Sequence, residues 1–382
     1  MKCEMKLHPI SSLVCTDKRP KSPRREGQSF SVSRLDHHPC EMGYISDAMG
    51  VRKVFPRVPS NTKLAVEVPL LFQEPDIYHG YRDNYQPFSY YTGSAFWLHN
   101  ESVNVWTHLI ALMVLLRQTW SLCSNLDLLN DGHAQVFAVY CFGCCAYTLA
   151  SALAHLYQSR DELTHHTCFY MDYAGVSLYG NATALACYHL ASPSSFFHFW
   201  RGWFMPLNCF LSVTMCACCG FAKYKYRRPY PKTRKYWQII SSGLGYAQII
   251  SPVYYTLIHQ LYNRQTTPLG QDFYLHLLQC ALFIPGSLFF AVPYPQRFWP
   301  GLCDLFGHSH QLFHVFMSLM TYFQMKALYL NVIQKRDIHT DLSNPSFLTT
   351  FGYVLVVLVL DLVVVWVLRM KTYQKLKKEA KD

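Results

Sequence analysis

Charged residues are scarce in this sequence of 382 residues: Asp, Glu, Lys and Arg make up 15% of it, against about 25% in an ordinary soluble domain. Hydrophobic residues make up 51%, so much of the surface has to face something other than water. That composition excludes an intrinsically disordered chain. The 15 cysteines show no repeating spacing and mostly lie in apolar runs, which excludes a disulfide-framed secreted module.

Apolar stretches of about 20 residues recur from residue 102 onward, and each is long enough to cross a bilayer. No apolar run with a cleavage site precedes Trp106, so we expect no signal peptide, and the first span has to direct insertion itself. The predicted fold class is therefore all-α integral membrane. We predict eight spans, at residues 102–121, 134–157, 167–189, 198–220, 237–258, 272–292, 305–330 and 348–368.

Basic residues collect in alternate breaks between these spans. Residues 1–100 hold 13 Lys and Arg, residues 221–236 hold 7 and the tail from Arg369 holds 6, whereas the opposite set of breaks holds 3. By the positive-inside rule this asymmetry predicts a cytoplasmic N-terminus and a cytoplasmic C-terminus, which fits eight crossings. The net charge of +11 therefore indicates contact with an anionic membrane face rather than with nucleic acid.

The same pattern predicts how the chain is divided. Ser, Pro, Lys and Arg are frequent before residue 66, as expected of a segment that cannot bury a core. The predicted parts are a disordered basic cytoplasmic extension (1–65), a cytoplasmic interfacial segment (66–101), a seven-helix transmembrane core (102–332), an extracellular loop with an eighth transmembrane helix (333–368) and a basic cytoplasmic tail (369–382).

Polar side chains within the predicted spans gather at one depth. Ser151 and His155 are four residues apart, and so are His310 and His314, so each pair shares a helix face. The alternating topology places both pairs, together with Asp172, in the cytoplasmic leaflet. Three imidazoles with an open fourth position suit zinc, and Asp172 would then orient a bound water while Ser151 supports it. The alternative for such histidines is hydrogen bonding between helices.

A second polar group precedes and enters the first span. Glu101, Asn104 and His108 are three and four residues apart and form one stripe at the cytoplasmic boundary. Two interpretations stay open, a functional stripe or the interfacial start of a helix anchored by Trp106. His308 lies on a different face from His310 and is left out of the predicted metal site.

Four motifs occur along the chain, at residues 99–108 (HNESVNVWTH), 151–155 (SALAH), 169–173 (FYMDY) and 307–314 (GHSHQLFH). In this order they resemble the motifs of the progestin and adipoQ receptor family. The resemblance extends from about Pro69 to Val332. Within the family, the membrane progestin receptor branch is the most similar, nearest the alpha and beta types. This similarity rests on residues 80–82, on residues 222–231 and on the eighth span with its basic tail.

The resemblance implies a seven-helix core that encloses zinc near the cytoplasmic side. The ligands would be His155, His310 and His314, with Asp172 and Ser151 close by. One departure lies in the seventh span, where Lys326 and Asn331 stand at positions at which relatives usually carry acidic residues.

The resemblance also implies a function, a plasma-membrane steroid receptor. It would bind a progestin such as progesterone and give rapid non-genomic signals through an inhibitory G protein, with a role in oocyte maturation. The basic break at residues 221–236 would be the cytoplasmic signalling surface, unless it only fixes the topology. The alternative is a zinc-dependent ceramide amidohydrolase, as in the adiponectin-receptor branch, with Asp172 and Ser151 as catalytic residues. In either case the chain would bind membrane lipid.

Overall fold

The computed structural model describes residues 59–265, 268–334 and 345–381. The predicted basic extension lies outside the described residues as far as residue 58. Throughout the described ranges the regular structure is helical, apart from one isolated β-bridge between Lys63 and Tyr81. The all-α class predicted from the apolar spans is therefore confirmed.

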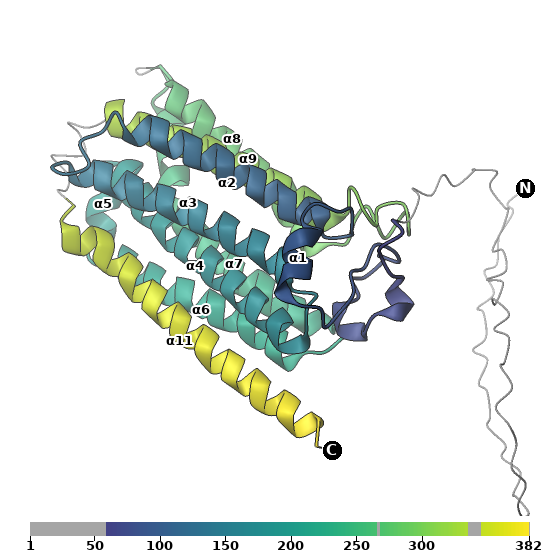
Figure 1. The fold of residues 1–382 in the computed structure, drawn as a ribbon. Coiled ribbons are helices and arrows are strands. Elements are labelled where there is room, and N and C mark those ends of the chain that lie inside the picture. Colours follow the sequence, from purple (N-terminus) through teal and green to yellow (C-terminus); the bar gives the residue numbers. More distant parts are fainter. Residues whose placement is uncertain (1–58, 266–267, 335–344, 382) are drawn as a thin grey trace, which may run out of the picture. The chain divides into compact units, whose positions relative to one another are not determined.

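Eight helices in the described ranges are longer than 20 residues, and they run side by side as a bundle (Figure 1). Each overlaps one predicted span. The helices are α2 (Ser102–Cys123), α3 (Gly132–Tyr157), α4 (Glu162–Leu190), α6 (Phe204–Lys225), α7 (Lys232–Tyr262), α8 (Gln271–Ala291), α9 (Ser309–Gln334) and α11 (Phe347–Glu379).

Two predicted span boundaries are wrong because a glycine interrupts the backbone. The span at 198–220 is divided into α5 (Ser194–Trp200) and α6, and between them Gly202 has a φ of 84°. The span at 305–330 begins later, at α9, because Gly307 precedes it with a φ of 85°. Left-handed backbone of this kind ends a helix, and hydropathy does not record it.

The last helix is longer than the predicted eighth span. It runs without a break from Phe347 to Glu379, so most of the predicted basic tail continues the same helix. α11 packs along α4 and α6 on the outside of the bundle (Figure 1).

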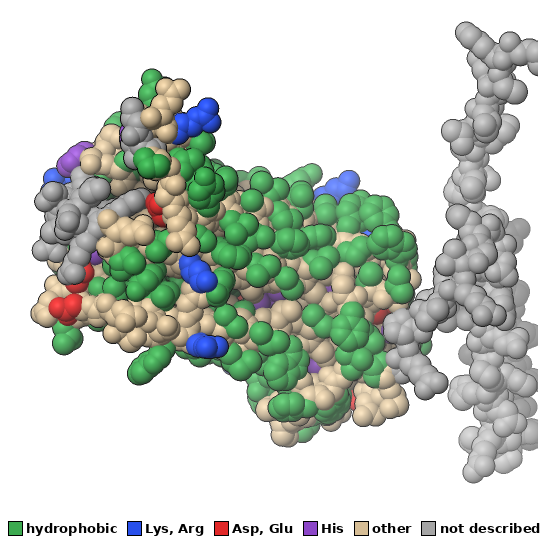
Figure 2. Space-filling view, turned by 90° about the horizontal axis from the view of Figure 1, so that it is seen from above, with side chains coloured by type: hydrophobic (Ala, Val, Ile, Leu, Met, Phe, Trp, Pro, Cys, Tyr) green, Lys and Arg blue, Asp and Glu red, His purple; other side chains and the backbone are tan. Residues whose placement is uncertain are grey.

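Four of the described helices, α3, α6, α8 and α11, are long and apolar enough by composition to cross a membrane. In α9, which is less apolar by composition, Thr321, Gln324 and Asn331 are at most 3% exposed. Polar side chains turned toward the bundle interior lower mean hydropathy without facing lipid. Figure 2 shows a face on which hydrophobic side chains predominate and charged ones are few.

Small residues bring α3 and α4 close together. A Cβ added to Gly143 would lie 2.8 Å from the Cβ of Ala182, and one added to Gly175 would lie 2.9 Å from that of Ala150. Larger residues at these two glycines would push the helices apart. This close packing carries the final turns of α3, with His155, alongside the first half of α4.

Candidate metal centre

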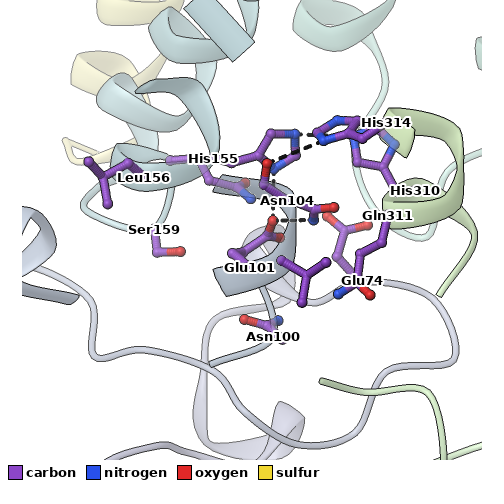
Figure 3. A network of polar contacts seen from close by, with 12 residues as sticks. Glu74, Asn100, Glu101, Asn104, His155, Leu156, Ser159, His310, Gln311 and His314 are labelled. Atoms are coloured by element: carbon purple, nitrogen blue, oxygen red, sulfur yellow. Dashed lines mark hydrogen bonds and ion pairs between the residues drawn. The ribbon is translucent and has the colours of Figure 1, made fainter. Parts of the chain in front are cut away.

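Three histidines converge between α3 and α9 (Figure 3). His155 lies in the last turn of α3, and His310 and His314 occupy the first two turns of α9. One ring nitrogen from each lies within 4.8 Å of the other two. The Nε2 atoms of His155 and His310 are 3.1 Å apart. Nitrogen ligands of a tetrahedral zinc ion stand about 3.4 Å apart, so the arrangement has the dimensions of a metal site.

The remaining ring nitrogens of two of these histidines have partners that select the metal-binding tautomer. Nδ1 of His155 lies 2.7 Å from Oε2 of Glu101. Nδ1 of His314 lies 3.3 Å from the carbonyl oxygen of Asn104 and 3.2 Å from the hydroxyl of Thr107. A proton on Nδ1, donated to these oxygens, leaves Nε2 free to bind a metal. The residues therefore fit a metal with imidazole ligands.

Glu101 is the centre of the polar network around this site. It is 5% exposed and also accepts a hydrogen bond of 2.7 Å from Nδ2 of Asn104. Burial alone would raise the pKa of Glu101, but the adjacent His155 and the Asn104 amide together hold that pKa below its usual value. A buried carboxylate of this kind orients His155 and raises the basicity of its ring.

The rest of the stripe at the start of α2 belongs to the same site. The ring of His108 stacks on that of His314 with centroids 3.7 Å apart and planes inclined by 16°. Trp106 donates from its indole nitrogen to the carbonyl oxygen of Ala95 at 2.7 Å, which ties α2 to the segment before it. Of the two interpretations left open by the sequence, the structure places Glu101, Asn104 and His108 around the histidines.

The family assignment follows from comparison with known proteins. A family model described as haemolysin-III related matches residues 96–325 of the chain, which include all three histidines. The chain belongs to this family. Its relatives include membrane progestin receptor beta of Mus musculus, 36% identical over 293 residues, which are 76% of this chain and 81% of the relative.

Two further relatives carry the same kind of name. Membrane progestin receptor alpha-B of Danio rerio is 35% identical, over 78% of this chain and 84% of its own length. Membrane progestin receptor alpha of Homo sapiens is 35% identical, over 72% of this chain and 78% of its own length. The resemblance to the progestin and adipoQ receptor family and its membrane progestin receptor branch is thereby confirmed. This haemolysin-III-related chain is an all-helical membrane protein.

Asp172 and Ser151 lie beside the three histidines in this haemolysin-III-related fold. Asp172 is half-buried on α4, next to the Ser151 side chain of α3 and within electrostatic reach of His155. Neither is among the three residues whose ligand atoms converge. The Asp172 carboxylate therefore lies at the side of the three histidines.

Arg82 supports the site from the segment that precedes α1 (Phe88–Ser94). Its guanidinium is 2% exposed and donates to the carbonyl oxygens of His155, at 2.8 Å, and Leu156, at 2.6 Å. Burial lowers the pKa of Arg82 to about 10, which leaves it cationic at neutral pH. It therefore caps the end of α3 that carries His155. The sequence contained Arg82 only as part of a family motif, and nothing in its spacing showed this contact.

Proposed function

We propose that this chain is a plasma-membrane receptor for a progestin such as progesterone. The observation that carries the proposal is that relatives covering about three quarters of the chain are named membrane progestin receptors. The functional motifs lie inside the matched region, residues 96–325. The ligand would shift the balance between two helix arrangements through its different affinity for each.

Zinc is the metal we propose for the three-histidine site. His155, His310 and His314 would hold it, while Glu101 fixes the ring of His155. A metal shared by α3 and α9 would join two helices that are far apart in the sequence. When bound, zinc would supply binding free energy to the folded state and a Lewis acid at the fourth position.

The proposed topology has eight crossings, with both termini in the cytoplasm. It is supported by the alternation of basic breaks and by the eight long helices of the described ranges. The metal site would then lie near the cytoplasmic face, because His155 is in the last turn of α3 and His310 in the first turn of α9, and the basic break that follows α6 would lie on the same side.

Saturation binding of labelled progesterone tests the receptor proposal. The membranes would come from cells that lack nuclear steroid receptors and express either the intact chain or the double variant His310→Ala/His314→Ala. Saturable binding by the intact chain is expected, with loss in a normally expressed double variant. Absence of binding above untransfected membranes, despite surface expression, would refute progesterone as the ligand.

An inhibitory G protein is the partner we propose for signalling, with progestin-triggered oocyte maturation as its physiological response. The connection between α6 and α7 supports this contact because Arg227 in the loop is exposed, as are Lys225 at the end of α6 and Lys232 at the start of α7. Neutralising these three residues should abolish progestin-dependent inhibition of adenylyl cyclase while steroid binding persists. Unchanged signalling at normal surface expression would mean that the loop only fixes the topology.

A zinc-dependent ceramide amidohydrolase is the second candidate function. It is favoured by the position of Asp172 and Ser151 beside the three histidines. Asp172 would accept a proton during hydrolysis, and Ser151 would hold its carboxylate in place. Release of fatty acid from ceramide by the purified chain, lost in Asp172→Asn with zinc content unchanged, would establish this activity. No release by the intact zinc-loaded chain would exclude it.

A further inference from the structure

A group of cations with too few acidic partners surrounds Tyr230, in the loop between α6 and α7. The Tyr230 ring centroid lies 3.7 Å from the guanidinium carbon of Arg234, 4.8 Å from that of Arg228 and 5.8 Å from Nζ of Lys223. We call these four residues the Tyr230 cluster. Three like charges around one ring repel each other unless anions balance them.

Few carboxylates are available to the Tyr230 cluster. Glu74 forms an ion pair with Arg228, whose side chain is 7% exposed. Glu101 also acts on Lys223 through its charge, but Glu101 is engaged by His155. One carboxylate therefore balances Arg228, and Arg234 keeps a positive charge without a paired carboxylate. Burial and the two neighbouring guanidinium groups lower the pKa of Lys223, so its ammonium form also lacks a compensating anion.

Lys223 is the most deeply buried member of the cluster. It is 2% exposed, its Nζ lies 3.8 Å from the ring centroid of Phe169, and its hydrogen bond to the Tyr230 hydroxyl is long, at 3.5 Å. Burying an ammonium group without a carboxylate costs several kcal/mol. A lysine that served only to orient the chain in the membrane would avoid this cost by staying exposed.

Unsatisfied donors give an independent sign of a missing anion. The Nε atoms of Arg228 and Arg234 are both buried, and neither has a hydrogen-bond partner in the described part of the chain. Buried guanidinium donors of this kind are nearly always paired, and a phosphate presents the oxygens that match them. Tyr230 and Arg234 are half-exposed, so the cluster is open on that side.

We propose that the Tyr230 cluster binds a phosphate monoester carried by the headgroup of an anionic phospholipid. Such a phosphate has a charge of about −1.5 to −2 at neutral pH, so it would pair with the Arg234 guanidinium and favour the ammonium form of Lys223. Exposed Tyr236 and Trp237 follow the cluster at the start of α7, and aromatic residues of this type mark the headgroup level of a membrane. This position favours a lipid over a soluble phosphate compound.

The site stands next to the metal centre. The Phe169 ring under Lys223 also makes an edge contact with the His155 ring, with centroids 6.3 Å apart. Glu74, the acidic member of the neighbourhood, lies beside the network of Glu101 (Figure 3). A bound headgroup would therefore hold the loop between α6 and α7 beside the three-histidine site, independently of the ligand that the receptor takes.

Binding of short-chain lipids to the purified full chain in non-ionic detergent tests the proposal. Dioctanoyl phosphatidylinositol 4,5-bisphosphate should bind saturably, and dioctanoyl phosphatidylcholine should not bind at the same concentrations. Arg234→Gln and Lys223→Gln should each weaken binding at least about fivefold, the effect of one cation near a membrane surface. Arg227→Gln is the matched control, because Arg227 is an exposed neighbour that pairs with Glu379; its affinity should change less than about twofold.

A variant with the opposite effect separates lost binding from lost folding. Glu74→Gln removes the carboxylate that pairs with Arg228, so it should tighten binding of the bisphosphate lipid about threefold or more. An unfolded protein cannot show that gain.

Three results would overturn the proposal. They are equal binding of the zwitterionic and anionic lipids, equal losses in Arg227→Gln and Arg234→Gln, and displacement of the lipid by inorganic phosphate at matching concentrations, which would identify a soluble phosphate as the ligand. None of them bears on progesterone binding, so the receptor proposal is tested separately.

Discussion

Nδ1 of His155 and Oε2 of Glu101 are 2.7 Å apart, and both side chains are buried. His155 ends α3, whereas Glu101 immediately precedes α2, so the contact joins two helices at the level of the three-histidine site. The contact fixes the ring orientation and the tautomer of His155, whose Nε2 atom is directed at His310. The metal affinity of the site should therefore depend on Glu101, although Glu101 is not one of the three proposed ligands.

Replacement of Glu101 by Gln should lower zinc affinity about 10- to 100-fold, the usual effect of losing a carboxylate behind a ligating histidine. Zinc retained by the purified protein during titration with a chelator measures the change. Glu162→Gln is the control, because Glu162 is a glutamate that contacts Tyr85 away from the three histidines. Equal retention in both variants would show that Glu101 has no part in metal binding.

Removal of the metal should destabilise the bundle, because the metal would connect α3, which carries His155, with α9, which carries His310 and His314. A chelator should lower the thermal midpoint of the purified chain by several degrees, and zinc should restore it. His310→Ala should start from the lower midpoint and respond to neither reagent. The control His198→Ala, on α5, should behave like the unmodified chain. A midpoint insensitive to the chelator in the zinc-loaded protein would contradict a metal that joins the helices.

Arg82→Ala should destabilise the end of α3, because two carbonyl groups lose a charged donor inside the protein. Each hydrogen bond to a charged group contributes about 1.5–3 kcal/mol to the free energy of unfolding. Arg82→Lys should recover part of the loss, since an ammonium group cannot reproduce the fork of the guanidinium. Denaturation followed by circular dichroism compares the variants. Equal stability of Arg82→Ala and the unmodified chain would show that water replaces the guanidinium.

The helices were predictable because lipid-facing and core-facing residues are both apolar over long runs. The eighth span and its basic tail show the limit of that signal, because Arg369 and the lysines after it continue the helix without being hydrophobic. Gly202 and Gly307 show another limit. Their positive φ values end or delay helices inside stretches that hydropathy assigns to a single span.

The histidines of the site were predictable because i,i+4 spacing and alternating topology determine both helix face and depth. His155, His310 and His314 lie together as that reasoning expected. The partner of His155 was harder to assign, because a polar stripe at Glu101 also suits an interfacial helix start. The role of Arg82 could not be predicted from the sequence. Its contact with the last carbonyl groups of α3 depends on how residues 59–101 fold back onto the bundle.

The proposed topology predicts where the two ends of α11 lie. An epitope tag after residue 382 should be stained by antibody only in permeabilised cells, because α11 would return the chain to the cytoplasm. A tag inserted between residues 340 and 341 should be stained in intact cells, since the proposed topology puts the connection before α11 outside the cell. The two tags thus act as controls for each other. Staining of the C-terminal tag in intact cells would mean seven crossings, and α11 would then lie along the membrane surface or outside it rather than across it.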